Sequence, residues 1–360
     1  MLNSFKEIRD VICDSLLPII GNKCALFNLP YHDNIGDVLI WEGVESFFQD
    51  KGIECVARSS IYTFDQCKLE PDITICINGG GSLGDTWRGF QDEMNKIVES
   101  YPNNRIVILP QSVYYNDKSY IQIDSNILGS HNDLFICARD KVSYEILCKF
   151  FSNRILLVPD MALYALYKED ERHTEKKLFL KRTDKEATDY SKFDLDEMEI
   201  HDWPTIEYVY SHKEEVLFTN RIRRKFLRIG LKLLPHGFAF RIFEKGLIKS
   251  LMSEKIDIGN RWRMSHDELM YLIYLNKYKF KGELNRLIDW YANAYYRPIT
   301  VTYGVDFINQ YDVVYSTRLH GGLLSLILGK TCYLIDNSNH KISAFYDTWC
   351  DYLGDRVSLV

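Results

Sequence analysis

The first half of the chain repeats one pattern, in which a short apolar run is followed by a loop with Gly or Asp and then by an amphipathic stretch. Near-continuous Val, Ile and Cys runs are typical of parallel strands buried on both faces, and the amphipathic stretches are typical of helices. The pattern predicts strands at residues 23–29, 54–58, 73–78, 106–109, 134–138 and 155–158, and helices at 36–51 and 141–150. We therefore expect a βαβ sheet here.

The same pattern returns in the second half, where it is interrupted. Strands are predicted at 177–181, 299–303, 312–316 and 331–335, and helices at 304–311 and 321–330. Between these pieces, residues 184–202 are acidic and polar, and residues 218–255 carry many Arg and Lys among leucines and phenylalanines. We interpret this interruption as an inserted helical segment at about 203–296.

The length of 360 residues exceeds the roughly 150 residues of an average domain. We expect an α/β fold of two Rossmann-like domains that face each other across a cleft, an N-terminal domain at 1–167 and a C-terminal domain at 168–360. Ligands of doubly wound sheets bind beyond the carboxyl ends of the strands. The chemistry is therefore expected in the loops that directly follow strands.

Charge and cysteine usage narrow the class of protein. A formal net charge of -6 argues against nucleic-acid binding, which needs a basic surface. Nine cysteines without a C-x-x-C pair indicate buried thiols in a reducing cytoplasm and no metal site. The N-terminus lacks the apolar core of a signal peptide, and no apolar run reaches the roughly 20 residues of a membrane span. We expect a cytoplasmic protein with at most peripheral membrane contact.

The basic segment 218–255 is the candidate for such contact, on the inner face of the plasma membrane. Its mixture of leucine, phenylalanine and basic residues suits an anionic lipid surface. A solvated helical hairpin packed on the second domain, or a contact between subunits, is the alternative. The oligomeric state is left open by the sequence.

The first strand is followed by Asp33-Asn34-Ile35-Gly36-Asp37, at the start of the first predicted helix. Asn or Asp can cap this helix, and Gly36 allows the backbone to approach a ligand closely. Backbone amides at a helix start can face an anion or a sugar hydroxyl. Asn34, Gly36 and Asp37 are therefore candidates for ligand binding, with a plain helix cap as the alternative.

Three consecutive glycines follow the strand at 73–78. Such a run is costly in chain entropy, so we expect this backbone to lie close to a ligand. The P-loop lysine and the G-x-G-x-x-G spacing are both absent. The ligand-binding candidates from this loop and from the loop after strand 106–109 are Gly80, Gly81, Ser82, Asp85 and Gln111.

Two further loops of the first half carry charge. Arg139 follows the strand at 134–138, where it either binds an anion or pairs with its neighbour Asp140. Asp160 follows the strand at 155–158, and its simplest role is to cap the next helix.

The second half contributes cations at three strand ends. Arg182 follows strand 177–181 within a run of charges, and its guanidinium matches a phosphate or a carboxylate two bonds at a time. Arg318 and His320 lie two residues apart just before a helix start at Gly321, so on extended backbone they point the same way. Lys341 follows strand 331–335 and either reaches an anion or caps a helix. A buried histidine beside a surface arginine is the alternative for the Arg318–His320 pair.

Taken in order, these motifs resemble the polysaccharide pyruvyltransferase family. The motifs are NIGD, GGGSLGD, PQS, ARDKVS, VPD, KRTDKE, TRLHG and NHKISAFY, and the resemblance is weakest at about 190–296. It implies a GT-B-like fold with the site in the cleft and phosphoenolpyruvate as the donor. The donor-contacting residues of the family map onto Arg182, Arg318 and His320. Thr317 stands where the family often has an acidic residue, which leaves the role of that carboxylate open.

The implied reaction moves a pyruvyl group from phosphoenolpyruvate to a sugar of a cell-surface or exopolysaccharide precursor, forms a ketal and releases phosphate. Arg182, Arg318, Lys341 and the helix start at Gly321 would hold the donor's charge. His320 would be the acid or base, because imidazole changes protonation near neutrality. The candidates of the first half would bind the acceptor from the opposite domain: Asn34, Gly36, Asp37, Gly80, Gly81, Ser82, Asp85 and Gln111. Asp37 is the candidate partner base, with Asp85 as the alternative. The acceptor is a sugar that is either free or lipid-linked, and no cofactor or metal is expected.

Two other functions fit the same fold. A glycosyltransferase that uses a nucleotide sugar would need a carboxylate or a stacking platform for the nucleoside, where the second-half loops offer arginine and histidine. A carbohydrate-binding protein without catalysis would have no need of the Arg318–His320 pair.

Overall fold

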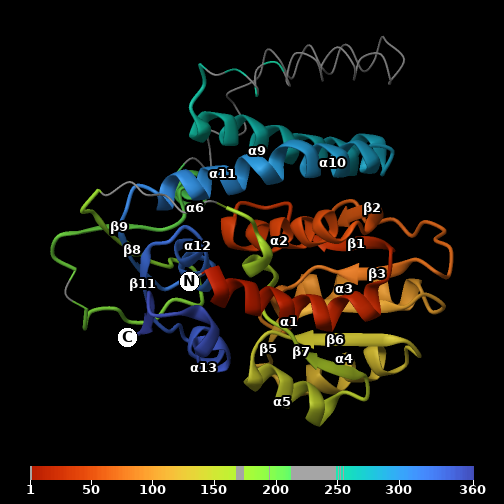
Figure 1. The fold of residues 1–360 in the computed structure, drawn as a ribbon. Helices are drawn as coiled ribbons and strands as arrows, with labels where there is room; N and C mark the ends of the chain where they lie inside the picture. The colour runs from red at the N-terminus through yellow and green to blue at the C-terminus, as the bar shows by residue number, and fades with distance from the viewer. Residues whose placement is uncertain are drawn as a thin grey trace.

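The computed structural model describes residues 2–167, 174–193, 195–211, 249, 251, 253 and 255–360. Two β-sheets lie beside each other, and helices cover them (Figure 1). All strand pairings of the described residues are parallel. The predicted α/β class with parallel sheets is confirmed, and the division into domains at residue 167 stays a prediction.

The larger sheet has seven strands in the order β2-β1-β3-β5-β6-β7, with β4 paired to β5. Its strands are β1 (Lys23–Leu29), β2 (Glu54–Ser60), β3 (Thr74–Ile77), β4 (Gly80–Gly84), β5 (Ile106–Tyr114), β6 (Leu134–Ala138) and β7 (Arg154–Leu157). Strands β3 and β6 are buried along their whole length, and β1 is buried except at Lys23, as apolar parallel strands should be. The predicted strands are present with small shifts at their ends, except that β5 continues to Tyr114, past the predicted end at residue 109.

Helices of the first half connect these strands. They are α1 (Leu2–Ile20), α2 (Ile35–Lys51), α3 (Arg88–Ser100), α4 (Lys118–Gly129), α5 (Lys141–Phe150) and the 3-10 helix η1 (Met161–Tyr164). Asn34 is the N-cap of α2 and accepts a bond from the Gly36 amide, and Asp160 is the N-cap of η1. Both caps were predicted from the sequence.

The smaller sheet has five strands in the order β12-β11-β10-β8-β9. They are β8 (Lys177–Leu180), β9 (Met198–His201), β10 (Val313–Ser316), β11 (Thr331–Leu334) and β12 (Val357–Leu359). Helices α12 (Leu319–Ile327) and α13 (Lys341–Leu353) connect its C-terminal strands. Strands β9 and β12 were not predicted, because each is a short edge strand with polar positions.

A layer of helices lies on the other side of α2 from β1 (Figure 1). It consists of α6 (Pro204–Ser211), α9 (Ile258–Leu275), the π-helical turn η2 (Asn276–Phe280), α10 (Asn285–Tyr291), the π-helical turn η3 (Ala292–Tyr296) and α11 (Arg297–Ile308). The described parts of the predicted insertion are thus helical after β9. Most of the basic segment 218–255 lies outside the described residues.

The predicted strand at 299–303 is wrong, because these residues belong to α11. Its run of Ile, Thr and Val has β propensity, but α11 contacts α2 on one side and α9 on another. The buried positions of α11 have helical spacing, but Thr300 and Gly304 among them are not apolar, while Ile299 and Val305 outside them are. The apolar residues therefore lack the period by which a helix is recognised. Tertiary packing therefore overrides the local propensity here.

The two sheets share one hydrophobic core. A single cluster of buried residues includes strand residues of both sheets, and α2 contacts both α11 and α12. The N-terminal helix α1 contacts the C-terminal helix α13. Among the described residues, no helix combines the length and apolar character that a membrane crossing requires.

Candidate active site

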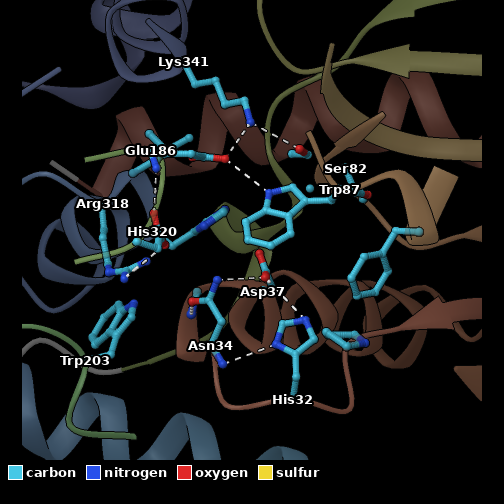
Figure 2. Close-up of a pocket in the computed structure, with 18 of the residues that line it drawn as sticks. His32, Asn34, Asp37, Ser82, Trp87, Glu186, Trp203, Arg318, His320 and Lys341 are labelled. Carbon is cyan, nitrogen blue, oxygen red and sulfur yellow. Dashed lines mark hydrogen bonds and ion pairs between the residues drawn. The ribbon is translucent and has the colours of Figure 1, made fainter. Parts of the chain in front are cut away.

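A pocket of about 380 Å³ lies between the two sheets. Residues that line it follow β1, β2, β3 and β6 of the larger sheet and β8, β9, β10 and β11 of the smaller one. This is where ligands of parallel α/β sheets bind. Figure 2 shows His32, Asn34 and Asp37 on one side and Glu186, Arg318 and Lys341 on the other.

His320 lies in the first turn of α12 and lines the pocket. Its Nε2 atom lies 3.2 Å from Asp160 Oδ2 and 3.4 Å from Arg139 Nη1. Asp160 is fully buried and also accepts a 2.8 Å bond from Arg139 Nη1. Burial by itself would raise the pKa of Asp160, but His320 and Arg139 together hold it below its usual range. Asp160 is therefore an ionised carboxylate that can stabilise a protonated imidazole.

Gly36 explains how His320 fits against the first half. A β carbon at residue 36 would lie 2.9 Å from both the β carbon and Nδ1 of His320. Any larger residue would push the imidazole away. The close approach found at Gly36 is to a side chain of the second half, and the predicted approach to a ligand stays a prediction.

Arg318 is almost completely buried and is held by Asp202. Its Nε bonds Asp202 Oδ1, and its Nη2 donates to Asp202 Oδ2 at 2.8 Å. Burial disfavours the charge, but the Asp202 carboxylate outweighs it and raises the pKa of Arg318. Thr317 is buried, accepts a bond from the Arg182 amide and does not contact the pocket. The carboxylate partner of Arg318 therefore comes from the loop after β9, not from position 317.

Arg182, Glu186 and Lys341 form a third charged group. Arg182 Nε donates to Asp184 Oδ1 at 2.7 Å, and its Nη1 lies 2.6 Å from Glu186 Oε2. Lys341 Nζ lies 3.2 Å from Glu186 Oε1 and donates to the Gly81 carbonyl at 3.2 Å. Burial lowers the pKa of Lys341, and Glu186 partly offsets this effect. The predicted cations are thus gathered on one side of the pocket.

The opposite side combines polar groups with aromatic rings. Asp37 Oδ2 accepts a 2.8 Å bond from Asn34 Nδ2 and lies 3.6 Å from His32 Nε2. Aromatic side chains that line the same pocket are Tyr62, Trp87 and Phe90. Aromatic faces beside amide and carboxylate oxygens suit a molecule that has both apolar C–H faces and hydroxyl groups.

The glycine run after β3 is not a plain loop. Gly80–Gly84 forms β4, which pairs with the part of β5 that extends past β3. A side chain at residue 81 would crowd Lys341 Nζ, since a β carbon there would lie 3.2 Å from it. Gly80, Gly81 and Ser82 all line the pocket.

Three predicted site residues do not line the pocket. The Asp85 carboxylate accepts bonds from the backbone amides of Asn116 and Asp117 and so holds a loop in place. Gln111 is buried and donates to the Asn78 carbonyl at 2.9 Å. Gly321 packs against the smaller sheet, where a β carbon would collide with Leu180. The direct ligand contacts that we predicted for these three residues are not supported by the lining of this pocket.

Several residues in and behind the pocket were not predicted from the sequence, or were predicted with other partners. Arg139 pairs with Asp160, whereas Asp140 instead accepts from Ser112 Oγ and caps α5. The sequence signal for Asp160 was its place after a strand, which equally fits a helix cap. Trp87 had no such signal, because its loop follows the unpredicted strand β4. Among the described residues, no group of three His, Cys, Asp or Glu side chains has the arrangement of a metal site.

Comparisons with known proteins place this geometry in a family. The chain is 29% identical over 342 residues to EpsO of Bacillus subtilis (strain 168), which is named for pyruvyl transfer; the match covers 93% of this chain and 88% of EpsO. It is 24% identical to general stress protein 30 of the same organism, over 79% of this chain and 89% of that protein. Pyruvyl transferase 1 of Schizosaccharomyces pombe is 26% identical over 39% of this chain and 38% of its own.

A crystal structure of a functionally uncharacterised Klebsiella pneumoniae protein aligns with 100% of this chain and 97% of its own, with a TM-score of 0.49 and 14% identity. The family model described as polysaccharide pyruvyl transferase matches residues 34–339, which include the pocket residues Asp37, Arg318 and His320. The chain therefore belongs to the polysaccharide pyruvyl transferase family, and it is an enzyme of that kind.

Proposed function

We propose that the enzyme takes its pyruvyl group from phosphoenolpyruvate and forms a pyruvate ketal on a sugar of a surface-polysaccharide precursor. The observation that carries this proposal is the juxtaposition in one pocket of the His320–Asp160 pair with Arg182, Arg318 and Lys341. A proton-transfer group beside several cations suits a donor that has both a phosphate and a carboxylate.

The first step adds a sugar hydroxyl to the donor. The hydroxyl oxygen bonds to the central carbon of phosphoenolpyruvate, the C=C double bond breaks, and its electron pair takes a proton at the methylene carbon. His320, held by ionised Asp160, supplies that proton. Asp37, on the opposite side of the pocket, is the base that accepts the hydroxyl proton.

The second step closes the ketal. A neighbouring hydroxyl of the same sugar attacks the same carbon, and the bond from carbon to the phosphate oxygen breaks. The phosphate leaves with the electron pair, and the second hydroxyl proton passes to the solvent or to the phosphate. The cations of the smaller sheet stabilise the leaving charge. The products are one ketal and one inorganic phosphate.

The acceptor lies along the wall of Asn34, Asp37 and the aromatic rings in this proposal. A pyranose ring presents C–H faces to Tyr62 and Phe90, while its hydroxyls bond to the amide and carboxylate oxygens. Gly80, Gly81 and Ser82 bring backbone groups to the same space.

The test is to incubate the purified enzyme with phosphoenolpyruvate and candidate sugar acceptors and to measure the acceptor by mass spectrometry. We expect a pyruvyl ketal adduct together with one phosphate per adduct. His320→Ala and Arg318→Ala should each reduce the rate by at least about a hundredfold, the usual contribution of a general acid or a charge-stabilising donor.

A nucleotide sugar offered in place of phosphoenolpyruvate serves as the control donor. Glycosyl transfer from it, without any ketal from phosphoenolpyruvate, would show that the proposed donor is wrong. Unchanged rates in both variants would show that the site has been misassigned.

A further inference from the structure

Each cation of the pocket already has a carboxylate partner. Arg139 pairs with Asp160, Arg318 with Asp202, Arg182 with Asp184 and Glu186, and Lys341 with Glu186. A donor with two anionic groups would enter a site whose charges are already balanced. Binding of the donor must therefore break the ion pairs of at least one of these carboxylates.

Three of the four carboxylates are anchored by the backbone. Asp160 accepts from the Ala162 amide at 2.9 Å, and Asp184 accepts from the Glu186 amide at 3.0 Å. Asp202 accepts from the amides of Thr183 and Trp203. Rigid backbone donors hold these three carboxylates in one position, so none of them is easily displaced.

The Glu186 carboxylate is different. Within the described parts of the chain, it is held only by side chains: Arg182 Nη1 at 2.6 Å, Lys341 Nζ at 3.2 Å and Trp87 Nε1 at 3.2 Å. These donors come from three separate segments, the loops after β8 and β4 and the start of α13. Figure 2 shows Lys341 and Trp87 both reaching the Glu186 carboxylate from different sides.

The environment of Glu186 is that of a bound anion. The residue is only 5% exposed, and its charge is kept because Lys341 and Arg182 lower its pKa against the effect of burial. The three donors thus form a complete site for a carboxylate group, and in this structure the site holds a side chain of the enzyme itself.

We propose that Arg182, Lys341 and Trp87 form the subsite for the donor's carboxylate, and that the Glu186 carboxylate occupies this subsite until the donor displaces it. This inference rests on the proposed function, since it takes phosphoenolpyruvate as the donor. It gives Trp87 a role as a ligand contact and makes Glu186 a competitor of the substrate. One carboxylate replaces another on the same three donors, so the charge of the subsite stays balanced.

The test is the affinity for phosphoenolpyruvate without acceptor, measured by isothermal titration calorimetry. Glu186→Gln keeps the shape of the side chain but removes the charge that competes with the ligand. We expect Glu186→Gln to bind phosphoenolpyruvate about tenfold more tightly than the wild type, the scale of one charge-assisted hydrogen bond. Glu186→Ala, which lacks the carboxylate altogether, should change the affinity in the same direction.

Two controls separate this role from a general effect of charge. Asp184→Asn removes a carboxylate of the same cluster that the backbone anchors, and it should not tighten binding. Trp87→Phe removes the indole N–H donor and keeps a smaller aromatic ring. In the wild type this N–H bonds Glu186 before binding and the ligand carboxylate after it, so its loss should change the affinity little. In the Glu186→Gln background, where no side-chain carboxylate competes, the same change should weaken binding severalfold. Circular dichroism and Tm establish that every variant is folded.

Pyruvate and inorganic phosphate, titrated separately, identify which anionic group the subsite takes. A gain for pyruvate in Glu186→Gln without a gain for phosphate supports the carboxylate subsite, and the reverse result overturns it. If the wild type binds phosphoenolpyruvate and Glu186→Gln binds it no more tightly, the role of Glu186 is wrong while the donor assignment stands. If neither protein binds phosphoenolpyruvate, the donor assignment itself fails and the subsite with it.

Discussion

His320 owes its chemical setting to the residues behind it. Asp160 and Arg139 both lie within hydrogen-bond distance of Nε2, and Gly36 leaves just enough room for the ring. Sequence patterns predicted Arg318 and His320 together because the two follow a strand and precede a helix. Asp160 could not be predicted as their partner, because it lies 160 residues away and its position after a strand also fits a helix cap.

Asp160→Asn tests the support of His320 at this scale. The pKa of Asp160 is depressed, so the stability that its charge contributes is present above the unfolded value of 3.8 and is lost only in strong acid. At neutral pH the variant leaves Arg139 without its carboxylate, and we expect a loss of about 3 kcal/mol in the free energy of unfolding. We also expect kcat to fall about a hundredfold or more.

The shape of the pH–rate profile distinguishes the two effects. A variant that is only less stable keeps the profile of the wild type at a temperature where it is folded. Loss of the carboxylate that bonds His320 Nε2 should instead change the shape of the profile, because the proposed acid has lost its partner. Asp117→Asn, at the exposed N-cap of α4, is the matched control and should leave both rate and profile unchanged.

Helices and strands were predicted correctly where their buried residues recur with one regular period. Strands β1 and β6 and helix α5 have the predicted bounds, since a strand buried on both faces and a helix with one apolar face each leave a clear period. The pattern failed for α11, whose buried face includes Thr300 and Gly304, and for β4, whose glycines carry no strand propensity. There the pairing with β5 makes the strand, and no local signal reports it.

Helix α10 carries a partly buried acid, Asp289, that bonds two loops of the larger sheet. Asp289 Oδ1 accepts bonds from Tyr31 Oη at 3.0 Å and Thr63 Oγ1 at 2.6 Å, in the loops after β1 and β2. Burial raises the pKa of Asp289 from 3.8 to about 7, although both hydroxyls oppose this effect. The folded protein therefore holds a proton that the unfolded chain releases at much lower pH.

The sign of this linkage gives a stability prediction. A raised folded pKa means that stability is fully present below pH 3.8 and is lost as the pH rises through about 7. Asp289→Asn cannot ionise, so relative to the wild type it should be neutral near pH 4 and more stable above pH 7, by at most roughly 4 kcal/mol. Urea unfolding at several pH values measures this difference. The exposed Glu283→Gln is the control, and an equal gain there, or no gain in Asp289→Asn, would contradict this linkage.

At the scale of the whole molecule, the carboxyl-terminal ends of strands from both sheets face one pocket. Core contacts of α2 with α11 and α12, and of α1 with α13, hold the sheets together. Polar bonds cross beside the pocket as well, from Lys341 Nζ to the Gly81 carbonyl and from Trp87 to Glu186. The paired α/β halves follow from the sequence pattern, but these cross-contacts join residues with no common local pattern, so only the folded chain reveals them.

One such contact, made by Trp349, connects helix α13 to a residue of the active site. The Trp349 indole N–H, on α13, donates a buried 2.7 Å bond to the carbonyl of Arg139, which lies 210 residues away in the larger sheet. Trp349→Phe keeps a smaller aromatic ring but leaves the Arg139 carbonyl without its hydrogen bond. We expect the free energy of unfolding to fall by about 1–2 kcal/mol. Arg139 also bonds the Asp160 carboxylate, which in turn bonds His320. We therefore expect kcat/KM to fall severalfold. Trp290→Phe, the same change at a half-exposed position on α10, should alter neither quantity. Chemical denaturation and steady-state kinetics on the two variants measure both quantities. If Trp349→Phe and Trp290→Phe give the same stability and the same kcat/KM, the bond from Trp349 to Arg139 does not position the catalytic group.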